Sequence, residues 1–163
     1  MISQSVKSQS QQIFANIEIL FKSISENDFN MVKGGFVVWK HFYHMIHSID
    51  KHFINPELFI EPLFHIKNLD IINYENDTHL TKEQLLVYYE QVRIRTLNYL
   101  NNLTENILNE TIVFKNMTVT KLELILAQLR HVFYHIGYLH CCIKIEKGET
   151  PEYVGLYKVV SEK

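Results

Sequence analysis

Glycine and proline are scarce in this chain, whose 163 residues include 5 Gly and 3 Pro. So few chain breakers leave room for long helices and argue against a many-stranded sheet, which needs frequent turns. The net charge is −2, and no block of basic residues stands out, so nucleic acid is not an expected partner. The two cysteines, Cys141 and Cys142, are neighbours, and adjacent side chains on a helix cannot easily bridge. We therefore expect two free thiols.

Long apolar runs are also missing from the sequence. No stretch resembles the roughly 20 apolar residues that span a membrane, and the polar segment from Met1 to Gln12 lacks the pattern of a signal peptide. A cytoplasmic protein is therefore expected. Apolar residues still make up 47% of the chain and charged residues 21%, which is typical of a globular protein. The length indicates a single domain over residues 1–163.

Four segments repeat apolar residues at the intervals of amphipathic helices. They are residues 4–25, residues 36–54, a third from 81 to between 103 and 107, and a fourth from 118 or 120 to 146. Thr81 and Gln84 match a capping box, and Gly148 suits a left-handed helix end. The expected fold is all-α, a four-helix bundle with long connections. We also expect a short helix over residues 58–64 and a brief extended segment over residues 111–114.

Two histidines of the last helix, His131 and His135, lie four residues apart. This spacing places both rings on one helix face, about 6 Å apart at Cβ, where one metal ion can reach both. The same face, within about 50°, also carries Leu124, Ala127, Gln128, Tyr138 and Cys142. A pair of this kind alone more often consists of two hydrogen-bonded histidines at the edge of a core. A durable metal site needs a third ligand from elsewhere.

The second helix offers four histidines, His41, His44, His47 and His52. His47 borders the apolar stripe formed by Trp39, Phe42, Ile46, Ile49 and Phe53, so the helical wheel favours it as the third ligand. His44 lies further round the helix. The two are three residues apart and can face the same side, so both stay open from the residues alone.

Two segments resemble the DinB/YfiT-like superfamily of metal-dependent bacterial enzymes. His131-Val-Phe-Tyr-His135-Ile-Gly137 matches the family's His-x-x-x-His-x-Gly on the last helix, and residues 39–50 resemble its aromatic-rich segment with one metal histidine. The resemblance spans residues 4–147. It implies a four-helix bundle whose metal ligands are His44, His131 and His135, with His47 as the rival of His44. Ile136 stands where many relatives have Arg, which puts an anion contact from that position in doubt.

Three neutral imidazoles leave coordination positions open, as in catalytic zinc sites. The resemblance implies a thiol-dependent transferase or a hydrolase that acts on a small electrophilic substrate, with a divalent metal ion and a low-molecular-weight thiol as cofactors. Zinc and nickel are the favoured ions, although imidazole also suits copper and iron. Gln128, Tyr43 or Asp50 are candidates to hold the ligand rings, and Tyr138 to line the pocket. Cys142, about 10 Å beyond His135, lies too far away to bind the ion.

A different class of function remains open, that of a non-catalytic helical bundle that binds a ligand or forms a dimeric scaffold. In a homodimer, the contact would involve Trp39, Phe42 and the aromatic residues of the tail. The tail, residues 150–163, is expected to pack on the bundle through Tyr153, Val154, Leu156 and Tyr157. The other histidines are expected to be structural or at the surface.

Overall fold

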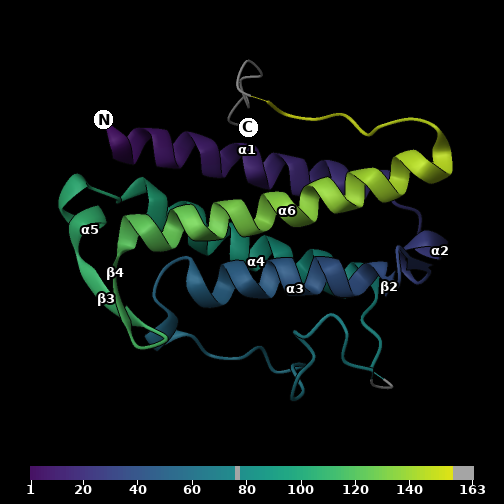
Figure 1. Ribbon diagram of the computed structural model, residues 1–163, viewed down its shortest axis with the longest axis horizontal. Coiled ribbons are helices and arrows are strands. Elements are labelled where there is room, and N and C mark those ends of the chain that lie inside the picture. The colour runs from purple at the N-terminus through teal and green to yellow at the C-terminus, as the bar shows by residue number, and fades with distance from the viewer. Residues whose placement is uncertain (76–77, 156–163) are drawn as a thin grey trace.

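The computed structural model describes residues 1–75 and 78–155, and this part of the chain is mostly helical (Figure 1). Its helices are α1 (Ile2–Ser23), α2 (Glu26–Phe29), α3 (Val38–His52), the 3₁₀ helix η1 (Pro56–Leu58), α4 (Lys82–Asn101), α5 (Glu105–Asn109) and α6 (Lys121–Lys147). Two small antiparallel pairs join β1 (Val32–Lys33) to β2 (Phe36–Val37) and β3 (Thr111–Phe114) to β4 (Met117–Thr120). The all-helical class predicted from the sequence is confirmed.

The four long helices pack side by side around one core. Helices α1 and α3 each contact both α4 and α6, and Figure 1 shows α6 between α1 and α3. Phe21 of α1 lies 4.3 Å from Phe42 of α3 and 5.7 Å from Tyr89 of α4, measured between ring centroids. Each large apolar side chain buried in this way contributes about 1.5–3 kcal/mol to stability. The packing of α3 on α6 brings together the helices that carry His44, His131 and His135.

The first connection contains more structure than expected. Residues 25–35 include α2, which Ser25 caps by accepting a hydrogen bond from the Asp28 amide, and strand β1. Phe36 and Val37 form β2 instead of the first turn of α3. Gly34 and Gly35 turn the chain between the strands with φ values of 58° and 93°, a region that favours glycine. A Cβ atom on Gly34 would also collide with the hydroxyl of Tyr138.

The expected helix over residues 58–64 is wrong. Only η1 forms there, and no helix or strand follows over residues 59–75 and 78–81. Pro62 accounts for the difference, because proline lacks an amide donor and its ring disfavours a helical residue before it. The third long helix ends at Asn101, earlier than expected, since Thr104 caps the separate helix α5.

The limits predicted for the last helix are confirmed. Thr120 and Glu123 form a capping box at the start of α6, and Gly148 ends the helix with φ of 71°.

The tail packs on α1, because Val154 is buried and its backbone makes two hydrogen bonds with Asn16, of 2.9 and 3.0 Å. Leu156 and Tyr157 lie outside the described residues. Among the described helices, none is both long and apolar enough for a membrane crossing.

The capping box of α6 gives a test of the fold. We expect Thr120→Ala to lower the free energy of unfolding by about 1 kcal/mol, because the substitution leaves an amide at the helix start without its acceptor. Urea unfolding followed by circular dichroism measures the change. Thr118→Ala, at an exposed position of β4, is the matched control and should change stability much less. Equal losses in both variants would contradict a specific role for the cap.

Candidate metal centre

Three imidazole rings converge between α3 and α6. Nε2 of His131 lies 3.0 Å from Nε2 of His44 and 3.1 Å from Nε2 of His135. One ring nitrogen from each of the three histidines lies within 4.8 Å of the other two. A tetrahedral zinc ion with bonds of about 2.0–2.1 Å holds its ligand atoms about 3.3 Å apart. The three rings therefore have the spacing that one metal ion requires.

The hydrogen bonds of His44 fix where its lone pair points. Its Nδ1 lies 2.6 Å from the carbonyl oxygen of Asp70, and a carbonyl only accepts. Nδ1 therefore donates, and in the neutral ring Nε2 keeps its lone pair toward the other two histidines. Nδ1 of His131 is buried and has no hydrogen-bond partner among the described residues.

The two rings of α6, His131 and His135, lie in surroundings that favour the neutral form, which binds metals. Burial, and to a smaller extent the neighbouring His44, lowers the pKa of His131 to about 4 and that of His135 to about 3. His135 is buried, whereas His44 and His131 are partly exposed. Neutral imidazole nitrogens that face one another at 3 Å repel through their lone pairs unless a proton or a cation lies between them. The arrangement suits a divalent ion.

The structure separates the two candidates for the third ligand. His44 joins the pair on α6, whereas Nε2 of His47 lies 2.6 Å from Oε2 of Glu61 on another side of α3. The helical wheel favoured His47 because it is nearer the apolar stripe, and His47 is indeed 2% exposed. Depth of burial does not say which neighbouring helix a side chain meets. Only the packing of α3 on α6 does so.

The residues expected to hold the ligand rings have other partners. The partners are Ser48 for Gln128, His65 for Tyr43, and both Tyr88 and Arg95 for Asp50. The observed supports are the carbonyl of Asp70, described above, and His41, whose Nδ1 lies 3.3 Å from Nδ1 of His135. Sequence reasoning missed both. A hydrogen bond to a backbone carbonyl cannot be predicted from a pattern of side chains. His41 could not be singled out, because it is one of four histidines on its helix.

His41 is held in place from its other side. Its ring is 3% exposed and stacks on Tyr138 with 4.2 Å between centroids and 24° between planes. The hydroxyl of Tyr138 donates to the carbonyl of Lys33 at 2.7 Å. Burial lowers the pKa of His41 to about 4, so this ring is neutral too. A line of contacts thus runs from the β1–β2 hairpin to His135.

The two cysteines and the residues of the expected dimer contact lie outside the histidine cluster. Cys141 and Cys142 are free, as expected, and neither belongs to the histidine cluster. Trp39 and Phe42 are 3% and 0% exposed, so the prediction that they form a homodimer contact is wrong. They are part of the core instead.

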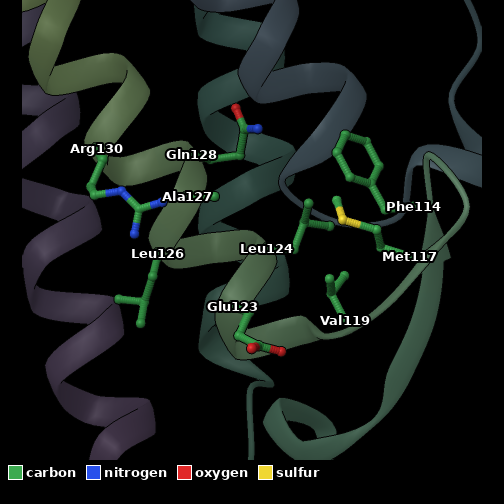
Figure 2. A pocket seen from close by; sticks show the side chains of 9 residues that line it. All are labelled: Phe114, Met117, Val119, Glu123, Leu124, Leu126, Ala127, Gln128 and Arg130. Atoms are coloured by element: carbon green, nitrogen blue, oxygen red, sulfur yellow. The ribbon is translucent and has the colours of Figure 1, made fainter.

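A cavity of about 370 Å³ lies between α6 and the β3–β4 hairpin, and none of the residues that line it is a histidine (Figure 2). Its lining consists of Phe114, Met117, Val119, Glu123, Leu124, Leu126, Ala127, Gln128 and Arg130. Ala127 and Gln128 precede His131 by four and three residues, so they lie one turn away on the same side of α6. Figure 2 shows Phe114, Met117 and Leu124 gathered between α6 and the β3–β4 hairpin. The cavity is mostly apolar, with one acidic and one basic side chain.

No family model, curated protein or solved structure matches the chain.

The histidine cluster gives a first prediction about metal binding. We expect His131→Ala to bind one zinc ion fewer than the wild-type protein, because Nε2 of His131 is the atom nearest both other ligands. With free zinc at about 100 times Kd, the site should add about 2.7 kcal/mol to stability, and His131→Ala should lose this gain. Elemental analysis and thermal unfolding of untagged protein measure the two effects. His79→Ala, an exposed histidine outside the cluster, is the control; an identical response in both variants would argue against the site.

The second prediction concerns His41 as a support. If Nε2 of His135 binds the ion, the ring proton lies on Nδ1 and donates to His41. His41→Ala should then weaken zinc binding by about 10–100-fold, without a change in the number of ions bound. His41→Asn retains an acceptor near the same place and should recover part of the affinity. Competition with a chromophoric chelator measures Kd. Unchanged affinity in His41→Ala would contradict the supporting role.

Proposed function

We propose that this protein is a metal-dependent enzyme of the DinB/YfiT-like type, a four-helix bundle with a divalent ion bound by His44, His131 and His135. One observation carries the proposal, namely the convergence of three imidazole nitrogens from two helices. The His-x-x-x-His-x-Gly motif and the mutual packing of α1, α3, α4 and α6 support it. Zinc and nickel are the favoured ions.

A divalent ion with three imidazole ligands has open positions, where it lowers the pKa of a bound thiol or water. The protein's own residues hold and orient the ligands. The carbonyl of Asp70 and the ring of His41 orient His44 and His135, while core packing excludes water behind the buried His135. The partial exposure of His44 and His131 leaves a route for a small molecule from solvent.

The neighbouring cavity supports a small substrate with an apolar part. Its lining of Phe114, Met117, Val119 and Leu124 suits such a group, and Arg130 adds a positive charge. In the proposed transfer, the sulfur of a low-molecular-weight thiol forms a bond to the electrophilic carbon of the substrate. The bond to the leaving group breaks, this group departs as an anion, and the thiol proton passes to solvent. A hydrolase would use water in place of the thiol.

Activity measurements test the proposal. Zinc- or nickel-loaded protein should accelerate the reaction of glutathione or cysteine with a chloronitroarene at least tenfold over the rate with His135→Ala. A chelator should abolish the difference. A parallel assay with a nitrophenyl ester and no thiol detects a hydrolase. If the ion binds but neither rate rises above that of His135→Ala, the enzyme proposal fails, and a non-catalytic ligand-binding scaffold takes its place. The homodimer and the cytoplasmic location stay predictions.

Filling the cavity provides a test of where the substrate binds. Ala127→Phe should lower kcat/KM about tenfold, because the larger ring takes space one turn from His131 that the substrate needs. The metal content should not change, since Ala127 is not a ligand. Ile94→Phe, at an exposed position of α4 outside the cavity, is the matched control. An unaltered kcat/KM in Ala127→Phe would place the substrate elsewhere.

A further inference from the structure

A second cluster of metal-binding side chains lies where the long loop after α3 returns to that helix. It consists of His47 from α3 and of Glu61 and His65 from the loop. Oε2 of Glu61 lies 2.6 Å from Nε2 of His47 and 3.6 Å from Nδ1 of His65. The ligand atoms of the three residues lie within 4.8 Å of one another. We propose that this cluster binds a second divalent transition-metal ion, such as zinc, and so fastens the loop to α3.

The donor set suits such an ion. Two imidazoles and one carboxylate are the protein ligands of zinc in several hydrolases and of iron in non-haem oxygenases. Burial lowers the pKa of His47 despite the opposing effect of Glu61, so this ring is neutral. For Glu61 burial acts to raise the pKa, but hydrogen bonds from His47 and Lys51 outweigh it and lower the value. The carboxylate is therefore charged and can act as an anionic ligand.

The positions of these side chains need little change to hold an ion, and the proton that Nε2 of His47 donates to Glu61 would move to Nδ1 when the ion binds. The rings of His47 and His65 are almost parallel, with 13° between planes and 5.0 Å between centroids. Nζ of Lys51 lies 3.1 Å from Oε1 of Glu61 and fixes that oxygen, which leaves Oε2 toward the imidazoles. A tetrahedral ion holds its ligand atoms about 3.3 Å apart. The 2.6 Å distance from Glu61 to His47 must therefore lengthen, and the 3.6 Å distance from Glu61 to His65 must shorten. Each change is less than about 1 Å.

One neighbour competes with the ion. The hydroxyl of Tyr43 is hydrogen-bonded to Nδ1 of His65, and burial raises the pKa of this phenol, so it is protonated and donates. An ion must take the lone pair that this hydroxyl now occupies. Removal of the hydroxyl in Tyr43→Phe should therefore tighten the second site severalfold, whereas loss of the carboxylate in Glu61→Gln should abolish it.

The loop connects the second cluster to the first. Its described part, residues 59–75 and 78–81, has no helix or strand of its own, yet it also supplies the Asp70 carbonyl that orients His44. A cross-link that closes a long loop stabilises it by restricting its alternative conformations. An ion on His47, Glu61 and His65 would thus hold the segment that positions a ligand of the first ion.

Counting bound zinc tests the proposal and separates it from the proposed function. Untagged full-length protein, stripped with a chelator and dialysed against zinc, should bind two ions. Glu61→Gln, His65→Ala and His131→Ala should each bind one, and Glu61→Gln combined with His131→Ala should bind none. Glu57→Gln, which changes an exposed carboxylate of η1, and His79→Ala should still bind two.

The outcomes are distinct for the two sites. The second site would be overturned if Glu61→Gln and His65→Ala both still bind two ions. It would also be overturned if the wild-type protein binds a single ion that only His131→Ala removes. One ion that only the Glu61 and His65 variants remove would support it and contradict the proposed function. Circular dichroism checks folding, and if His65→Ala does not fold, Glu61→Gln decides, because the Glu61 side chain is 41% exposed.

Proteolysis tests the role in the loop. Lys67 is exposed and lies two residues after His65, so trypsin should cleave there when the loop opens. Zinc should slow this cleavage at least tenfold in wild-type protein and in His131→Ala, but not in Glu61→Gln. Tyr43→Phe should reach the same protection at a lower zinc concentration. Equal cleavage with and without zinc in the wild-type protein would overturn the proposed fastening of the loop.

Discussion

The contact between α3 and α6 is the constraint on which the rest depends. It brings the Nε2 atoms of His44, His131 and His135 together in a partly buried place, at spacings of 3.0 and 3.1 Å for two of the pairs. Neutral imidazoles so close have lone pairs in conflict, and a cation between them turns this repulsion into three bonds. The capping box of α6, the Asp70 carbonyl and the stacked pair of His41 and Tyr138 all serve to hold those rings where they are.

The parts of this arrangement that depend on local rules could be predicted from the sequence. The limits of α6 follow from Thr120, Glu123 and Gly148, and the shared face of His131 and His135 follows from helical spacing. The choice between His44 and His47 could not be predicted, because both lie on α3. Only the position of α6 against α3 determines which of the two rings meets His131 and His135. The role of the Asp70 carbonyl could not be predicted either, because the long loop has no periodic pattern.

For the loop between η1 and α4, the structure predicted from the sequence was wrong. A helix expected over residues 58–64 does not form, since Pro62 interrupts it, and the segment turns so that Glu61 and His65 face His47. Their spacing of four residues was visible in the sequence, but nothing in it indicated that His47 lies opposite. Two clusters thus use neighbouring turns of α3, one directed to α6 and the other to the loop. The loop contributes to both, through Asp70 in the first and through Glu61 and His65 in the second.

The central claim is that three imidazoles from two helices hold one ion. Anomalous diffraction at the zinc absorption edge, on crystals of untagged protein grown with zinc, tests it most directly. The account predicts an anomalous peak about 2.0–2.1 Å from Nε2 of each of His44, His131 and His135. Zinc bound elsewhere in the crystal, with no peak between these three rings, would contradict it.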